Sequence, residues 1–256
     1  IYERRMGILS LNSLFWHPAD LAWFIFNASA ILFVIDSKGL AGVSAFIGSL
    51  ALRIKDILAW IFVVPIYNKK IIKYIPILLL IVFVFVCIYK RVYPKHYLQY
   101  FGDLYSMKTA RNALYWTGLS IMKENFPLGE GFGRFGGFIS YKYYSPVFEK
   151  YGIHSVYGLS TKKGNFISDT FWPMIIGEGG LLGLFFYILL IYNIFSFLFK
   201  KNDDFFSEKL LLIGRNMFIM SIIISIAAPV FVRPPQYFIL FGFTGLIYSY
   251  IKEIHY

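Results

Sequence analysis

Residues 179–199 read GGLLGLFFYILLIYNIFSFLF and contain no charged side chain. A helix needs about 20 mostly apolar residues to cross the hydrocarbon core of a bilayer. The whole chain has the same character, because 58% of its residues are hydrophobic and only 15% are charged, whereas soluble domains carry about 25% charged residues. So much apolar and aromatic surface also excludes intrinsic disorder. We therefore expect an integral membrane protein.

Further apolar stretches predict five more membrane spans. With the first, the expected spans cover residues 14–35, 39–66, 74–90, 171–199, 210–232 and 235–252. The second of these is ambiguous, because Arg53, Lys55 and Asp56 interrupt it. We expect a short span over Gly39–Ile54 followed by an interfacial piece over Ile57–Ile66, and one long tilted helix through both is the alternative.

These spans divide the chain into three parts, and the predicted fold is an all-α polytopic membrane protein. Residues 1–90 and 171–256 hold the N-terminal and C-terminal transmembrane helices, and residues 91–170 form a long loop. Because the first residue is Ile and no signal peptide precedes Leu14, we expect the chain to be the C-terminal part of a longer polytopic protein.

The basic surplus of the chain, 25 Lys and Arg against 14 Asp and Glu, predicts its orientation, because short cytoplasmic loops are enriched in Lys and Arg. If Arg4 and Arg5 are cytoplasmic, the short outer turns hold only Lys38 and Arg233. The expected inner positions are Arg53, Lys55, Lys69, Lys70, Lys73, Lys200, Lys201, Lys209 and Lys252. This orientation places the 91–170 loop on the outer face.

Within the loop, residues 110–122 have the periodicity of a helix. Its expected apolar side consists of Leu114, Trp116, Leu119 and Met122. Arg111 lies near the start of this helix, where the macrodipole does not favour a cation. It is either a surface arginine at the level of the lipid headgroups or a phosphate clamp, for which the planar guanidinium is well suited.

A glycine-rich stretch, PLGEGFGRFGG at residues 127–137, contains the spacing G-x-G-x-x-G at Gly131, Gly133 and Gly136. We reject a dinucleotide-binding site, because that fingerprint requires a preceding strand and a βαβ unit, and here an amphipathic helix precedes it. Closely spaced glycines still let backbone N–H groups approach an anion. With Arg134 in the same turn, Gly131 and Gly133 are candidate anion-binding residues.

Three titratable residues are candidate catalytic groups. Glu178 lies about one turn inside a predicted membrane helix, where an ionisable residue is a candidate for function or for pairing. Its expected partners are Lys38, Arg111 and Arg233. Asp169 either caps the helix that follows it or acts as a general base. His154 is either a packed or exposed residue or a base.

Four cations of the outer face, together with the glycine-rich turn, predict a site for a lipid-linked phosphate or pyrophosphate. They are Lys38, Arg111, Arg134 and Arg233. No nucleic-acid partner is expected, because topology and this site account for the basic residues. No metal or cofactor is expected either, since the loop lacks a suitable Asp/Glu/His cluster. The single cysteine, Cys87, excludes a disulfide within the chain.

The order of these motifs resembles the bacterial O-antigen ligase/polymerase superfamily. The likeness rests on Arg111 to Trp116, on PLGEGFG at 127–133 and on IGEGGLLG at 176–183. The Ser37-Lys38-Gly39 turn is similar to a Ser-Arg/Lys turn of that superfamily, and His17-Pro18 is similar to the turn that opens its preceding span.

The resemblance implies a GT-C-like helical bundle whose long outer-face loop contains short helices. It implies a multi-pass glycosyltransferase of the bacterial cytoplasmic (inner) membrane, with its active site on the outer face. The substrate would be an undecaprenyl-pyrophosphate-linked oligosaccharide, and chain-length regulator and flippase proteins would be partners. By the same likeness Arg111 would bind the pyrophosphate.

Asp169 stands where ligases of the superfamily carry a histidine, nine residues before Glu178. This difference favours polymerisation of repeat units into capsular polysaccharide, exopolysaccharide or O-antigen, with Asp169 as the base and His154 in reserve. The alternatives are ligase-type glycan transfer, a flippase or transporter for the lipid-linked oligosaccharide, and a non-catalytic subunit of an export complex.

Overall fold

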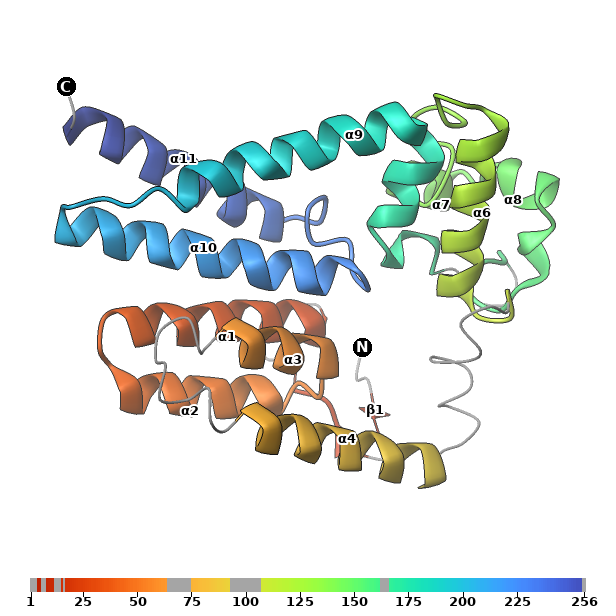
Figure 1. Ribbon diagram of the computed structural model, residues 1–256. Helices are drawn as coiled ribbons and strands as arrows, with labels where there is room; N and C mark the ends of the chain where they lie inside the picture. The colour runs from red at the N-terminus through yellow and green to blue at the C-terminus, as the bar shows by residue number, and fades with distance from the viewer. Residues whose placement is uncertain are drawn as a thin grey trace. The chain divides into compact units, whose positions relative to one another are not determined.

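The computed structural model describes residues 4–5, 8–11, 15, 17–63, 75–92, 107–161 and 166–254. Its helices are α1 (Pro18–Val34), α2 (Lys38–Ser49), α3 (Ile54–Val63), α4 (Ile75–Val92), α6 (Ala110–Glu124), α7 (Phe138–Lys142), α8 (Val147–Lys150), η3 (Ile153–Ser155), η4 (Ile167–Asp169), α9 (Trp172–Leu198), α10 (Phe205–Ser225) and α11 (Gln236–Ile254) (Figure 1). A two-residue antiparallel hairpin, β1 (Arg4–Arg5) with β2 (Ile8–Leu9), precedes them. Apart from this hairpin the described chain is helical, so the predicted all-α class is confirmed. The expected inner residues Lys69, Lys70 and Lys73 lie outside the described residues.

The chain forms two compact units, each described by itself below. Unit 1 comprises residues 1–88, 195–224 and 233–256, and unit 2 comprises residues 89–194 and 225–232. The three-part division expected from the sequence differs from this one, because the first part of α9 and the segment after α10 belong with the long loop in unit 2.

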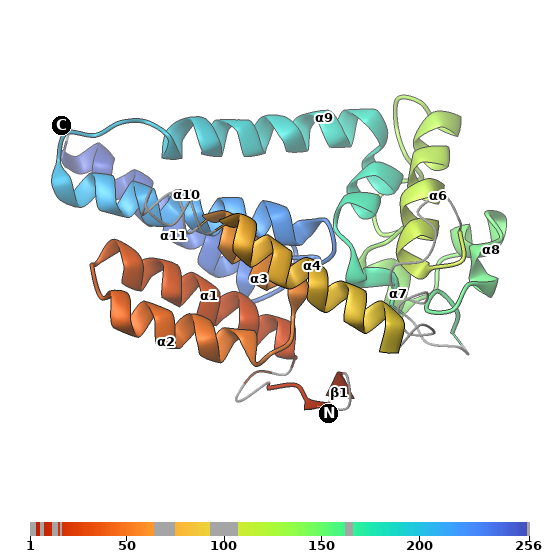
Figure 2. The ribbon, with the colours of Figure 1, turned by 60° about the horizontal axis from the view of Figure 1, so that its bottom comes forward.

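In unit 1, α1 and α2 form an antiparallel pair that lies side by side in both ribbon views (Figure 2). His17 caps α1, since its Nδ1 accepts a hydrogen bond from the Ala19 amide at 3.2 Å. Ser29 Oγ donates to the Ala41 carbonyl at 2.7 Å. At Gly48 a side chain would meet Phe26 at 3.3 Å, so glycine here sets the close approach of the two helices.

The second expected span is broken. The continuous helix over residues 39–66 is wrong, because α2 ends at Ser49 and α3 begins at Ile54. Leu52 takes φ 54° between them, a backbone conformation that cannot continue a helix. Arg53 then turns toward the start of α1, where its Nη2 lies 3.1 Å from His17 Nε2.

A side chain at the start of α1 also forms polar contacts with two residues at the start of α11. Asp20 Oδ2 lies 3.1 Å from Arg233 Nη2, and Gln236 Nε2 donates to Asp20 Oδ1 at 3.2 Å. Since Arg53 contacts His17 one turn away, Arg53 and Arg233 lie at the same end of unit 1. The sequence-based placement of Arg53 inside and Arg233 outside does not agree with these contacts, and the side of the membrane on which the long loop lies stays a prediction.

Lys38 lies at the opposite end of unit 1 from Arg233. It begins α2, directly after the turn that ends α1, and Figures 1 and 2 show this turn far from the start of α11. The 17 residues of α1 separate the two ends by about 26 Å at 1.5 Å per residue. Lys38 pairs instead with Asp36 at 3.6 Å.

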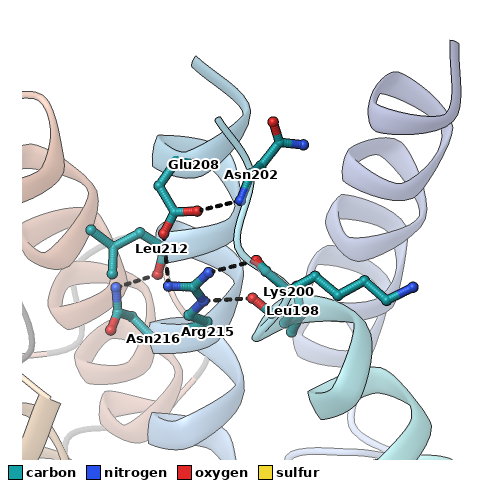
Figure 3. Close-up of polar contacts among 7 residues, drawn as sticks. All are labelled: Leu198, Lys200, Asn202, Glu208, Leu212, Arg215 and Asn216. Atoms are coloured by element: carbon teal, nitrogen blue, oxygen red, sulfur yellow. Dashed lines mark hydrogen bonds and ion pairs between the residues drawn. The ribbon is translucent and has the colours of Figure 1, made fainter. Parts of the chain in front are cut away.

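An arginine closes the connection between α9 and α10 (Figure 3). Arg215 donates from Nε to the Leu198 carbonyl, from Nη2 to the Lys200 carbonyl at 3.1 Å, and from Nη1 to Glu208 Oε1 at 3.0 Å. A cation is favourable at the C-terminus of a helix, where the last carbonyls lack partners. This explains a charge that stands in the middle of α10, between the apolar runs 210–213 and 217–220.

Among the described residues, one helix, α9, is long and apolar enough to cross a bilayer, and α1 is apolar but shorter. The helix is not straight, because Gly180 takes φ 61° and ψ −150° inside it, and the bend is visible in Figure 1. The expected span 210–232 is shifted, since α10 covers 205–225 and turns follow it through Pro229.

Unit 2 shows that the long loop has a hydrophobic core of its own. The buried residues of this core are Ala113, Leu114, Ile121, Phe135, Val147, Phe148, Ile153, Leu159 and Ile167. The expected apolar side of α6 is wrong in part. Trp116 and Leu119 are exposed, and Ala113, Thr117 and Gly118 are buried in their place, because Gly118 lets the first turn of α9 approach.

Candidate functional site

The break in α9 and the glycine-rich loop complete each other's backbone hydrogen bonds. The Glu130 amide donates to the Gly177 carbonyl at 2.9 Å, and the Gly131 amide donates to the Glu178 carbonyl at 3.1 Å. On the other side of the break, the Leu182 amide donates to the Pro127 carbonyl at 3.2 Å. A buried helix end needs such partners, so residues 127–131 stabilise the interruption.

Glycine is required on both sides of this contact. A Cβ atom on Gly129 would lie 2.3 Å from the Gly177 oxygen, and one on Gly180 would lie 2.2 Å from the Leu128 carbonyl carbon. A Cβ atom on Gly177 would lie 2.3 Å from the Phe135 ring. The two glycine motifs noted in the sequence therefore form one packed junction.

The carboxylate of Glu178 occupies the turn that was expected to bind an external anion. Its Oε1 accepts from the Phe135 amide at 3.0 Å, and the Gly133 amide also interacts with this carboxylate. Glu178 is 8% exposed. The turn does cradle an anion, as the glycines predicted, but that anion is a side chain of the same protein.

This arrangement corrects several sequence-based roles. The Gly131 amide is bonded to a carbonyl, and the Gly133 amide faces Glu178, so neither is placed to hold a pyrophosphate. Two of the cations expected to pair with Glu178 pair elsewhere, Lys38 with Asp36 and Arg233 with Asp20. The carboxylate of Glu178 is held instead by the backbone amides of Phe135 and Gly133.

Arg134 lies between the two residues whose amides face Glu178 and is itself exposed. No hydrogen bond or ion pair to its guanidinium is found among the described residues. The junction beneath it is fixed by backbone bonds, so Arg134 projects from a rigid turn. Nearby, Glu130 forms an ion pair with Lys150.

Arg111 is the candidate ligand-binding residue whose surroundings best fit an added ligand. It lies in the first turn of α6, which Thr109 caps by accepting from the Asn112 amide. Arg111 is half-buried, and its Nε is buried with no hydrogen-bond partner within the described part of the chain. A buried polar group without a partner is costly, so this position is suited to an anionic ligand.

Tyr115 follows Arg111 by one turn of α6 and links this helix to the segment after α10. Its hydroxyl donates to the Ile226 carbonyl at 2.9 Å, and burial raises the pKa of Tyr115 to about 12 although the Arg111 charge opposes this shift. The phenol therefore stays neutral and is occupied as a donor. In the same unit, Trp172 Nε1 donates to Ser225 Oγ at 2.9 Å.

Asp169 and His154 lie on different short helices of unit 2. Asp169 ends η4, which contacts both α6 and α7, so this carboxylate lies on an element adjacent to the helix of Arg111. Asp169 is exposed. His154 is exposed on η3, which contacts α8. The structure thus associates the elements of Arg111 and Asp169, and the η3 helix of His154 shares the hydrophobic core of unit 2 with them through Ile153.

Sequence reasoning missed one buried carboxylate in unit 1. Asp56 is 0% exposed, and neither of its carboxylate oxygens has a hydrogen-bond partner among the residues that the structure describes. It was noted in the sequence only as an interruption of an apolar stretch. A carboxylate within such a stretch is itself a signal of function or pairing.

Comparison of the chain with protein-family models, with curated proteins and with solved structures finds no match. The likeness to the O-antigen ligase/polymerase superfamily therefore rests on the order of short motifs alone.

Proposed function

We propose that this protein is a multi-pass membrane glycosyltransferase with a GT-C-like helical bundle. It polymerises undecaprenyl-pyrophosphate-linked oligosaccharide repeat units at the outer face of the bacterial cytoplasmic membrane. Support comes from the lipid-length apolar helix α9, from the folded aromatic loop that precedes it, and from the sequence likeness described above.

The observation that carries the proposal is the half-buried side chain of Arg111, whose buried Nε has no hydrogen-bond partner among the described residues. A planar guanidinium binds a phosphate through two parallel hydrogen bonds. Arg111 then binds the pyrophosphate of the donor lipid, and the exposed Arg134 supplies a second cation from its rigid turn. This site uses two of the four cations expected from sequence, since Lys38 pairs with Asp36 and Arg233 pairs with Asp20.

The proposed reaction is a displacement at the anomeric carbon of the donor glycan. The acceptor hydroxyl oxygen forms the new bond to that carbon while the bond from carbon to the pyrophosphate oxygen breaks. Asp169 takes the proton of the hydroxyl as general base, and undecaprenyl pyrophosphate leaves with the bonding electron pair. Arg111 stabilises the charge that develops on the leaving group.

A transporter or flippase for the same lipid-linked oligosaccharide is the second candidate. Two observations favour it: the interruption of α9 at Gly180 and the unpartnered buried carboxylate of Asp56. Transporters use broken helices and intramembrane ionisable residues at their binding sites. The carbonyls freed in α9 are bonded to the 127–131 loop, which favours the enzyme.

Substitution in the intact protein, expressed in its own membrane, tests the proposal. Arg111→Ala and Asp169→Asn are each expected to abolish long glycan chains while single repeat units still reach the cell surface. Lys123→Ala, an exposed cation at the other end of α6, is the matched control and is expected to leave the chain-length distribution unchanged.

Two results separate the alternatives. Normal chain lengths in both variants would refute the site. Loss of single repeats from the surface as well as of long chains would favour transport over polymerisation.

A further inference from the structure

The glycine-rich loop of unit 2 exposes large apolar side chains. Phe132 is 91% exposed, Phe126 is 69% exposed and Leu128 is 59% exposed. Such exposure is unusual for aromatic side chains, and a contiguous exposed apolar patch marks an interaction site. The loop backbone is held by three hydrogen bonds to α9, so these side chains are displayed from a fixed scaffold.

The place of this loop along α9 gives its depth in the bilayer. Beyond the break at Gly180, α9 continues from residue 181 to residue 198. These 18 residues span about 27 Å at 1.5 Å per residue, close to the roughly 30 Å of the hydrocarbon core. If this segment spans the core, the break at Gly180 lies at the boundary between hydrocarbon and headgroups.

The loop is bonded to α9 at that boundary. Leu182, the first bonded residue past the break, donates to Pro127, and Leu128 contacts the Gly180 position. The exposed side of α9 starts at the same place, with Leu181 and Phe185 exposed. The apolar surface of the loop is thus continuous with the apolar surface that α9 presents to lipid.

The surrounding side chains are those of a membrane interface. Tyr141 and Tyr143 are exposed on or just after α7, and Lys142 lies 5.3 Å from the Tyr143 ring centre. Aromatic rings and basic side chains are enriched at the headgroup level, where basic residues attract anionic lipid. The neighbouring Phe138, 63% exposed, extends the apolar surface.

We infer that residues 126–132 form a membrane-dipping loop, whose side chains Phe126, Leu128 and Phe132 insert into the outer leaflet beside α9. Non-helical backbone is tolerated near hydrocarbon only when its polar groups are satisfied by protein. The hydrogen bonds to α9 meet this condition for Glu130 and Gly131. The occupant of the patch is lipid, and the inference rests on the proposed membrane placement of α9.

Fluorescence quenching in vesicles tests this depth. The protein carries Cys87→Ser, which removes its single cysteine, and one new cysteine labelled with an environment-sensitive dye. The three positions are Phe132 in the loop, Leu189 on the exposed face of α9, and Ser155 on η3 as an exposed control. The vesicles contain phosphatidylglycerol and phosphatidylethanolamine, with and without lipids spin-labelled on their acyl chains.

Blue-shifted, lipid-quenched emission is expected at positions 132 and 189, with water-like, unquenched emission at 155. Quenching at 189 with water-like emission at 132 would overturn the loop inference and leave the membrane placement of α9 intact. Blue-shifted emission at 132 without lipid quenching would also overturn it, in favour of a protein partner or a second copy. Absence of quenching at 189 would refute the proposed membrane placement itself.

Discussion

At the scale of single residues, two glycines at the break in α9 have opposite surroundings. Gly129→Ala places a Cβ atom 2.3 Å from the Gly177 oxygen, a backbone atom that cannot move aside. Overpacking of this kind costs about 1–3 kcal/mol. We expect the variant to unfold at a lower temperature in detergent, measured by circular dichroism.

Gly179→Ala is the matched control, because a Cβ atom there meets nothing within 4 Å. Removing a helical glycine is expected to leave stability unchanged or to raise it by up to about 1 kcal/mol. Equal destabilisation of both variants would show that the loop does not pack into the α9 break.

Two substitutions of Glu178 distinguish a structural role of this residue from a catalytic one. Glu178→Ala leaves the Phe135 amide buried without its acceptor, at a cost of about 1–3 kcal/mol. Glu178→Gln keeps an oxygen acceptor, so it is expected to be more stable than the alanine variant and to keep long glycan chains. A fully stable Glu178→Gln protein that makes no long chains would instead identify Glu178 as catalytic.

The same residue shows where prediction from sequence stops. The glycine spacing indicated amides that can approach an anion, and the position of Glu178 inside a predicted span indicated function or pairing. The sequence does not show that the two belong together, because Gly133 and Glu178 lie in different motifs and meet only when α9 packs on the loop. The cost of burying Glu178 is offset by those amides.

At the scale of elements, Arg215 links the end of α9 to α10. Arg215→Lys keeps the charge but lacks the fork that reaches the Leu198 carbonyl, the Lys200 carbonyl and Glu208 together. We expect faster hydrogen–deuterium exchange in the 199–204 connection and a loss of about 1–3 kcal/mol. Lys201→Met, which changes an exposed cation of the same connection, is expected to exchange as the parent does.

Unchanged protection from exchange in Arg215→Lys would show that the positive charge alone is enough to order the connection between α9 and α10. Protection lost equally in both variants would mean that exchange there responds to any change of charge.

The positions of the helices could be predicted from the lengths of the apolar stretches in the sequence. The interruptions within these stretches could not. The expected spans 74–90, 171–199 and 235–252 differ from α4, α9 and α11 by one or two residues at each end. The breaks at Leu52 and Gly180 depend on distant partners, since Arg53 contacts His17 and the 127–131 loop bonds to α9. A local hydropathy average around Leu52 or Gly180 does not include these distant partners, so it cannot predict the breaks.

At the scale of the whole molecule, counting charges gave an orientation that the contacts in unit 1 contradict. The positive-inside rule treats each cation as a free loop charge. Arg53 and Arg233 are not free, because they contact His17 and Asp20 at the start of α1. Both therefore report packing rather than the side of the membrane.

The two ends of unit 1 are expected to lie at opposite faces of the membrane. Lys38 begins α2 at one end of α1, and Arg233 pairs with Asp20 at the other. In a Cys87→Ser background, Lys38→Cys and Val232→Cys, the latter adjacent to Arg233, are expected to react with an impermeant maleimide from opposite sides. One of them reacts in intact cells and the other only after permeabilisation. Reaction of both in intact cells would restore the orientation expected from charge and would contradict the pairing of Asp20 with Arg233.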